Sequence, residues 1–217
     1  MRAVLIDWLA ELHLKFKLSA ETLYLTVNLV DRFLDKVQIT KQKLQLVGIA
    51  SMLIASKYQE IYPPEVKDFV TVSDRAYRKQ DILDMEGQIL CTLNFKLTIP
   101  SLYAFLERFS RVTSLDKKSF FLTQYILETI LLDYNMLKYR PSLIVGSAIE
   151  LASKVLRNKI PTDILLKNIK QNESSLKSCC KDILGAIQNM EKGGLRVIHR
   201  KFTSSQFMEV SRIQLNL

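Results

Sequence analysis

The chain has 217 residues, 48% of them hydrophobic and 24% charged, which is the composition of an ordinary globular protein of one or two domains. Its longest mostly apolar stretch, residues 46–56, is too short to cross a membrane, and the amphipathic pattern that begins at residue 2 argues against a signal peptide. The net charge of +9 comes from basic residues scattered singly along the helices, which is more typical of a basic surface than of a nucleic-acid site.

The three cysteines, Cys91, Cys179 and Cys180, are odd in number and lack the spacing of metal ligands. Disulfides are rare in reducing compartments, so we expect reduced thiols in a protein of the nucleus and cytoplasm. We also expect no metal ion, no cofactor and no catalytic activity, because the sequence has no glycine-rich phosphate loop and no nucleophile elbow.

Ten segments show helical spacing of apolar residues or apolarity all round, and no alternating strand pattern is present, so the predicted fold class is all-α. The predicted helices cover residues 1–17, 20–35, 41–57, 64–71, 78–92, 101–110, 117–133, 141–157, 162–169 and 174–190. Ser19 and Ser101 stand where helix N-caps are expected.

The first predicted helix, MRAVLIDWLAEL, has an apolar arc of roughly 140°, which is wider than the stripe that a surface helix buries against its core. Met1, Val4, Trp8 and Glu11 follow one straight edge of this helix, with i, i+3, i+7 and i+10 spacing. That edge is a candidate binding surface, and ordinary core packing of Trp8 is the competing interpretation. His13 lies on the flank of the helix, where we expect an exposed or capping side chain and not a catalytic one.

An internal repeat divides the chain. At an offset of 97 residues, TLYLTVNLVDRFL (22–34) falls on SFFLTQYILETIL (119–131), and IASMLIASK (49–57) falls on GSAIELASK (146–154). The offset predicts two tandem units of five helices each. We place them at residues 1–98 and 99–192, followed by a C-terminal tail at 193–217. The third helix of each unit should be the hub, because residues 46–56 are apolar or small all round.

Glu86 occupies a position that the helical period assigns to the apolar face, four residues after Ile82. A carboxylate there is costly unless it is paired, and Lys57 at the end of the hub helix could reach it. By the repeat, Lys154 matches Lys57, and with one extra residue of slip, at an offset of 98, Leu184 falls where Glu86 would be. Only the first unit therefore keeps the pair, which from the residues alone is either a structural ion pair or a binding element.

Several long blocks occur in an order and spacing that closely resemble the mitotic A/B-type cyclins, the regulatory subunits of cyclin-dependent kinases. They are MRAVLIDWLAEL, ETLYLTVNLVDRFL, KLQLVGIASMLIASKYQEIYPPEV, DILDMEGQILCTLNF and LKYRPSLIVGSA. The stretch LDYNML is closer to the B type, whereas Glu11 is closer to the A type, so the resemblance leans toward B. It implies two five-helix cyclin boxes and a chain that is not an enzyme but holds a kinase in its active arrangement.

The resemblance also implies a kinase-binding surface in the first box. Lys57 and Glu86 match the family residues that bond backbone groups near the mobile helix of the kinase. Around them, the apolar contact positions of the family fall on Tyr58, Leu90, Phe95 and Leu97. Gln59 replaces a residue that is usually acidic. The chain begins at the first family motif, so we expect either a trimmed fragment without the preceding helix and degradation signal or the absence of part of the kinase contact.

A second surface that the resemblance implies is a shallow groove for Arg/Lys-x-Leu segments of substrates and inhibitors. It falls on Met1, Val4, Trp8, Glu11, Leu44 and Gln45. The leucine of the segment would enter the slot beside Trp8, and Glu11 would meet the cation.

Arg2 lies within the apolar face of the first helix, and we expect it to form a buried structural ion pair with Asp31 of the next helix. Two other functions compete with kinase activation: nucleic-acid binding in the manner of transcription factor IIB, which also has two cyclin-like repeats, and a helical scaffold without activating ability. The absence of a basic cluster with interleaved aromatic residues argues against nucleic acid.

Overall fold

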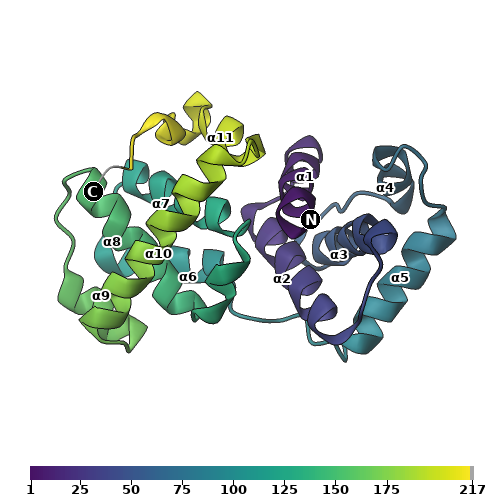
Figure 1. Ribbon diagram of the computed structural model, residues 1–217, viewed down its shortest axis with the longest axis horizontal. Coiled ribbons are helices and arrows are strands. Elements are labelled where there is room, and N and C mark those ends of the chain that lie inside the picture. The colour runs from purple at the N-terminus through teal and green to yellow at the C-terminus, as the bar shows by residue number, and fades with distance from the viewer. Residues whose placement is uncertain (216–217) are drawn as a thin grey trace. The chain divides into compact units, whose positions relative to one another are not determined.

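The computed structural model describes residues 1–215, apart from the side chains of residues 162, 191 and 192, and shows a chain of helices (Figure 1). Within this described part there is no strand, so the predicted all-α class is confirmed. The chain divides into two units at residues 99 and 100, with residues 2–7 grouped with the second unit.

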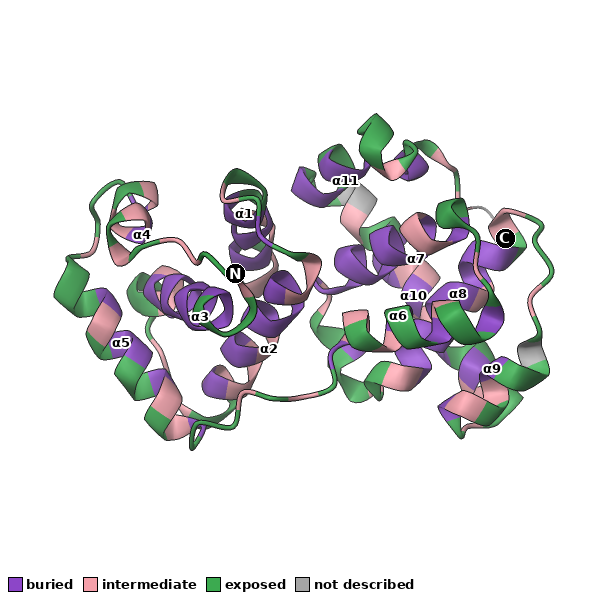
Figure 2. Cartoon of the chain, turned by 180° about the vertical axis from the view of Figure 1, so that it is seen from behind, coloured by how far each residue is buried: buried purple, intermediate pink, exposed green. Residues whose placement is uncertain are grey.

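The five helices predicted for the first repeat are all present. They are α1 (Arg2–Lys15), of which residues 8–15 belong to the first unit, and α2 (Ala20–Lys36), α3 (Leu44–Gln59), α4 (Val66–Val72) and α5 (Lys79–Thr92). The third helix begins later than predicted, because residues 41–43 form a separate 3-10 turn. Helix α3 is the hub: residues 46–56 are buried without interruption, and the helix packs against α2, α4 and α5 (Figure 2). Small residues along α3 allow this close approach on several sides.

The second unit repeats this plan. Its helices are α6 (Leu102–Thr113), α7 (Lys117–Ile130), α8 (Pro141–Val155), α9 (Thr162–Ile169) and α10 (Glu173–Lys192). Helix α8 is the second hub and packs against the other four. A Cβ atom at Gly146 would meet the Ile169 side chain, so a larger residue here would force that side chain of α9 to shift.

Both predicted N-caps are present, but they work differently. The Ser101 hydroxyl accepts a hydrogen bond from the Ala104 amide at 3.0 Å, as a capping serine should. At the start of α2, the carboxylate of Glu60 takes this role: its Oε1 accepts from the Ser19 amide at 2.8 Å, from the Ser19 hydroxyl at 3.0 Å and from the Thr22 hydroxyl. The sequence does not reveal this cap, because Glu60 follows α3, far from Ser19 along the chain.

The Glu60 cap should make the stability of the first unit depend on acid. Burial raises the pKa of Glu60, but hydrogen bonds from Thr22 and Ser19 and the nearby His13 outweigh it, so the pKa lies below its ordinary value of 4.5. A depressed pKa means that the stabilisation is present above about pH 4.5 and is lost as the pH falls through the lower folded-state pKa. We expect urea unfolding to show that Glu60→Gln costs stability at pH 6 and progressively less toward pH 3.

Asp35→Asn, at an exposed carboxylate near the other end of α2, is the matched control and should lack this trend. A Glu60→Gln cost that stays constant between pH 6 and pH 3 would contradict the assignment.

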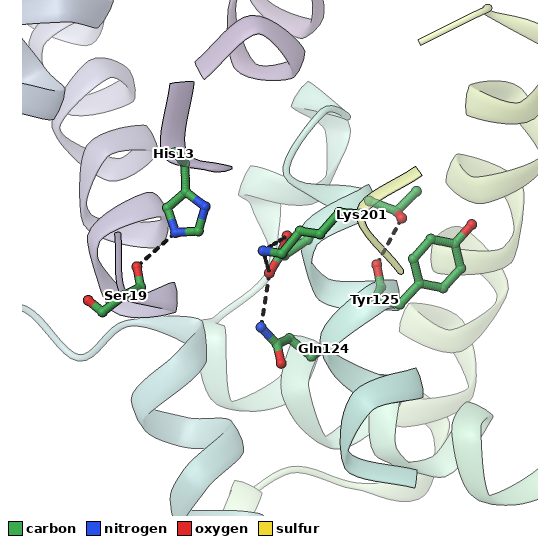
Figure 3. A network of polar contacts seen from close by, with 7 residues as sticks. His13, Ser19, Gln124, Tyr125 and Lys201 are labelled. Carbon is green, nitrogen blue, oxygen red and sulfur yellow. Dashed lines mark hydrogen bonds and ion pairs between the residues drawn. The ribbon is translucent and has the colours of Figure 1, made fainter. Parts of the chain in front are cut away.

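His13 corrects one of the two expectations for this residue. Its side chain is not exposed but buried, and its Nε2 lies 2.9 Å from the carbonyl oxygen of Ser19 (Figure 3). The ring therefore packs beneath the start of α2, because the chain turns back between α1 and α2.

Residues 193–215, the described part of the predicted C-terminal tail, belong to the second unit and pack against its helices. They contain α11 (Val197–Phe202) and the 3-10 turns η3 (Ser205–Phe207) and η4 (Val210–Arg212), and α11 and η4 pack against α7. Helix α11 is not among the helices predicted from the sequence, because a helix of six residues shows the helical period over less than two turns.

A buried polar network fastens α11 to α7. The Lys201 ammonium lies 2.7 and 2.8 Å from the two carboxylate oxygens of Glu128, and the Gln124 amide donates to the same carboxylate at 3.0 Å (Figure 3). The side chains of Lys201 and Glu128 are 4% and 0% exposed. The rings of Phe202 and Phe207 lie 5.2 and 5.7 Å from the ammonium and close this cation off from water.

All three cysteines are free thiols, with Cys91 exposed and the other two buried. Burial raises the pKa of Cys179 and of Cys180 to about 11, so neither is a thiolate at neutral pH. The two buried thiols therefore act as small apolar core residues.

Candidate functional site

Lys57 and Glu86 meet on the surface between the end of α3 and the middle of α5. Their ammonium and carboxylate form an ion pair, with the Lys57 side chain 46% exposed and that of Glu86 only 11%. Glu86 lies on the buried face of α5 with Ile82, Met85 and Ile89, as its place in the helical period indicates. A carboxylate held in this way is largely desolvated yet open to a partner on one side.

The apolar residues around the pair differ in exposure. Tyr58 and Phe95 are 47% and 66% exposed, whereas Leu90 and Leu97 are half-buried. The Tyr58 hydroxyl forms a hydrogen bond with the Thr98 hydroxyl, which ties the end of α3 to the segment after α5. Exposed aromatic rings beside a nearly buried carboxylate are typical of a protein-binding surface.

Phe95 is held in place by an uncommon backbone. It has a φ of 54°, and the residue before it, Asn94, has a φ of 50°. This left-handed backbone ends α5, where the Phe95 amide donates to the Leu90 carbonyl oxygen at 2.9 Å.

A hollow of about 420 Å³ opens beside Lys57. Its walls come from the end of α3, from residues 63–67 and from Lys79 at the start of α5. Ile61 and Tyr62, in the connection before it, are 87% and 92% exposed. Tyr58 and Phe95 are likewise exposed, so the first unit leaves several large apolar side chains uncovered.

The matching position in the second unit has different chemistry. Lys154 pairs with Glu150 on its own helix, at 3.1 Å, and Leu184 is half-buried where Glu86 stands in the first unit. Among the described residues, a lysine–glutamate pair therefore joins the third and fifth helices in the first unit and not in the second.

The predicted docking residues lie mostly on one edge of α1. Met1 and Val4 are 64% and 58% exposed, Glu11 is exposed, and Trp8 is half-buried. Trp8 is therefore partly covered, and its roles as a groove wall and as a core residue stay competing predictions. Leu44 and Gln45, at the start of α3, are half-buried.

Arg2 caps a helix of the second unit. Its guanidinium donates to the carbonyl oxygen of Leu131 at 2.8 Å, just past the C-terminus of α7, where a cation is favourable. The predicted ion pair of Arg2 with Asp31 stays a prediction.

No helix in the described part of the chain is long and apolar enough to span a bilayer. Among the same residues, no three histidine, cysteine or acidic side chains gather in a way that could hold a metal ion.

Two protein families cover nearly all of the chain. The family described as "Cyclin, N-terminal domain" matches residues 1–98, and the family described as "Cyclin, C-terminal domain" matches residues 100–216.

Curated relatives agree with these matches. The G2/mitotic-specific cyclin-B of Spisula solidissima is 42% identical over 213 residues, which cover 98% of this chain and 50% of the relative. The G2/mitotic-specific cyclin S13-7 of Glycine max is 42% identical over 208 residues, which cover 95% of this chain and 80% of the relative. The chain thus spans about half the length of most of the curated relatives it matches.

Among solved structures, a viral cyclin from herpesvirus saimiri superposes with a TM-score of 0.78 at 20% identity, covering 87% of this chain and 85% of that one. At this identity the likeness concerns the fold.

Proposed function

Since the chain belongs to the cyclin family, and its curated relatives at about 40% identity are B-type cyclins, we propose that it binds and activates a cyclin-dependent protein kinase. One observation carries this proposal: a nearly buried carboxylate, Glu86, and its partner Lys57 lie among exposed apolar side chains on the first unit. A surface of this kind suits a protein partner that offers both an apolar face and free backbone groups.

The proposed role is regulatory, not catalytic. A protein kinase is active only when its mobile helix and its activation segment are both in place. A partner that binds this arrangement more tightly than the inactive one shifts the population toward it. Tyr58, Leu90, Phe95 and Leu97 would cover the apolar face of the mobile helix. Lys57 and Glu86 would bond the backbone groups at its end, where a helix lacks internal partners.

The chain, immobilised and used to capture proteins from a dividing-cell lysate, tests this proposal. We expect a cyclin-dependent kinase among the retained proteins and phosphorylation of a short kinase substrate by the eluate. Retention by DNA that weakens with salt, without a kinase, would support the transcription factor IIB type of function instead.

We further propose that the edge of α1 and the start of α3 form a groove for Arg/Lys-x-Leu segments of substrates and inhibitors. The exposure of Met1, Val4 and Glu11 and the half-buried state of Trp8 support this, because an aromatic wall beside a carboxylate suits a leucine followed or preceded by a cation. Leu44 and Lys57 are 13 residues apart on α3. At about 1.5 Å per residue, the groove should therefore be ~20 Å from the Lys57 surface.

Truncating the aromatic wall should separate docking from activation. Trp8→Ala is expected to cost an Arg-x-Leu peptide about 2 kcal/mol or more of binding, as is common for buried aromatic anchors. Phosphorylation of a short peptide without this motif should stay nearly unchanged, because the wall is remote from Lys57. Isothermal titration with the peptide and a kinase assay measure the two effects.

Glu11→Ala is the companion variant and should weaken the same peptide less, with the larger loss at low salt, because this ion pair is exposed. A large fall in the melting temperature of Trp8→Ala together with a parallel loss of kinase activation would show that Trp8 is a core residue and not the wall of a groove.

We also propose that the protein works in the nucleus and the cytoplasm, which the three free thiols support. Fluorescence microscopy of the tagged protein through a cell cycle tests this location.

A further inference from the structure

The second unit contains a pocket of about 330 Å³ that the proposed function does not use. Its walls come from α7, from the last turns of α10 and from the segment that leads into α11. Leu132, Ile187 and Ile198 are buried and give it an apolar floor, whereas Arg196 and His199 are exposed and stand at its rim.

The wall that carries Arg196 and His199 is held firmly. The Lys201–Glu128 pair anchors α11 to α7 a few residues further along the chain. The Val197 amide donates to a carboxylate oxygen of Asp7 at 3.2 Å, and the His199 ring meets the Tyr125 ring edge to face, with 6.4 Å between centroids. A pocket whose wall is fixed before binding loses little conformational entropy when it is filled. The buried Lys201–Glu128 ion pair is costly to desolvate, and in this arrangement it fixes the position of α11.

The charges at the rim indicate the occupant. Among the described residues that line the pocket, none is a carboxylate, and Arg196 and His199 are basic. Arg200, exposed on the next turn, adds a further cation. The carboxylate of Asp7 accepts a hydrogen bond from the backbone amide of Val197. A pocket with an apolar floor and a basic rim complements an apolar side chain flanked by acidic residues.

We propose that this pocket of the second unit is a docking site for a short acidic segment of a partner protein, which inserts one bulky apolar side chain and pairs its carboxylates with Arg196. The volume lies at the lower end of the range for ligand pockets, which suits one side chain better than a whole cofactor. The proposal does not rest on kinase binding, because no residue of the pocket belongs to the surface around Lys57 and Glu86 or to the proposed groove between α1 and the start of α3.

Fluorescent peptides of five residues test it, each with two acidic residues on either side of a central Leu, Ile, Phe or Trp. Fluorescence polarisation with the whole chain should show saturable binding by at least one of them. Replacing the central residue with Gly, or the four acidic residues with Lys, should abolish it. In methyl NMR spectra, the bound peptide should shift the signals of Ile187 and Ile198.

Two variants and a control make the result specific. Arg196→Glu reverses the rim charge and should weaken the peptide by about tenfold or more. Leu195→Trp should fill the pocket and abolish binding while keeping Arg196. Arg111 is an exposed residue of α6 that does not line the pocket. Arg111→Glu makes the same charge change there and should leave the affinity for the peptide within about twofold.

Failure of all four peptides to bind at about 1 mM, equal losses in Arg196→Glu and Arg111→Glu, or NMR shifts confined to residues outside the pocket would each overturn the proposal. Unchanged melting temperatures of the variants confirm that they are folded.

Discussion

Glu86→Ala is expected to weaken binding of the kinase by about 2–5 kcal/mol, which is a loss of roughly 30-fold to several thousandfold in Kd. The reason is that Glu86 is nearly buried at the centre of the proposed interface, so its removal leaves both Lys57 and the backbone groups of the kinase without a partner. Surface plasmon resonance with the captured kinase measures the change, and circular dichroism should show an unchanged helical content.

Lys57→Ala should have an effect of the same order. Lys154→Ala is the matched control, since it truncates the equivalent lysine of the second unit, which pairs with Glu150 on its own helix. It should change kinase binding little. Equal losses from Lys57→Ala and Lys154→Ala would contradict the claim that only the first unit grips the kinase.

The same variants separate binding from a structural ion pair. If the pair served only to hold α5 against α3, Glu86→Ala would lower the melting temperature and would weaken every interaction of the chain together. A normal melting curve with a weakened kinase complex is the expected pattern. In the free chain, the pair then keeps two charges in place until the kinase supplies better partners.

Lys201→Ala should lower the stability of the second unit by about 3–5 kcal/mol. The substitution leaves the Glu128 carboxylate without its cation at a site where its side chain is 0% exposed, and the neutral Gln124 amide that still donates to it does not replace the lost charge. Urea unfolding followed by circular dichroism measures the change.

Replacing both partners distinguishes an orphaned charge from lost packing. The double variant Glu128→Leu with Lys201→Met should recover most of the stability, because no buried charge remains. Lys177→Ala removes a lysine from the exposed Lys177–Glu173 pair and should have little effect. A loss below about 1 kcal/mol in Lys201→Ala would mean that water reaches this site. Lys201→Ala should also weaken the acidic peptides, because α11 is a wall of the proposed pocket.

Much of the fold follows from patterns that lie within one helix or one repeat. The continuous apolarity of residues 46–56 predicts a surrounded hub, and α3 is such a helix. The offset between the repeats then predicts α8 as the second hub. Glu86 is detectable for the same reason, because a charged residue in an apolar period stands out without any knowledge of the tertiary structure.

The features that sequence reasoning missed depend on partners far apart along the chain. Glu60 caps α2 from the end of α3, and Lys201 reaches a carboxylate on α7. His13 is buried only because the chain turns back over it. No local period encodes these meetings. One signal was available for α11: Val197, Ile198 and Phe202 place apolar side chains on one side of a single helical turn and a half.

The residues of the candidate site differ in how far the sequence alone indicates them. Periodicity and the repeat single out the Glu86 position and its missing counterpart, Leu184. The assignment of Tyr58, Leu90, Phe95 and Leu97 rests on the family resemblance, because exposed and half-buried apolar residues near a helix end have no distinctive pattern of their own.

Stimulation of a purified cyclin-dependent kinase by the purified chain tests whether this protein activates such a kinase. Phosphorylation of a short peptide without a docking motif is followed while the concentration of the chain rises. We expect the rate of phosphorylation to increase by orders of magnitude and to saturate. Glu86→Ala should shift the midpoint to a higher concentration of the chain, whereas Trp8→Ala should leave the midpoint unchanged. Tight binding of the kinase without any rise in rate would contradict this expectation and would make the chain a scaffold.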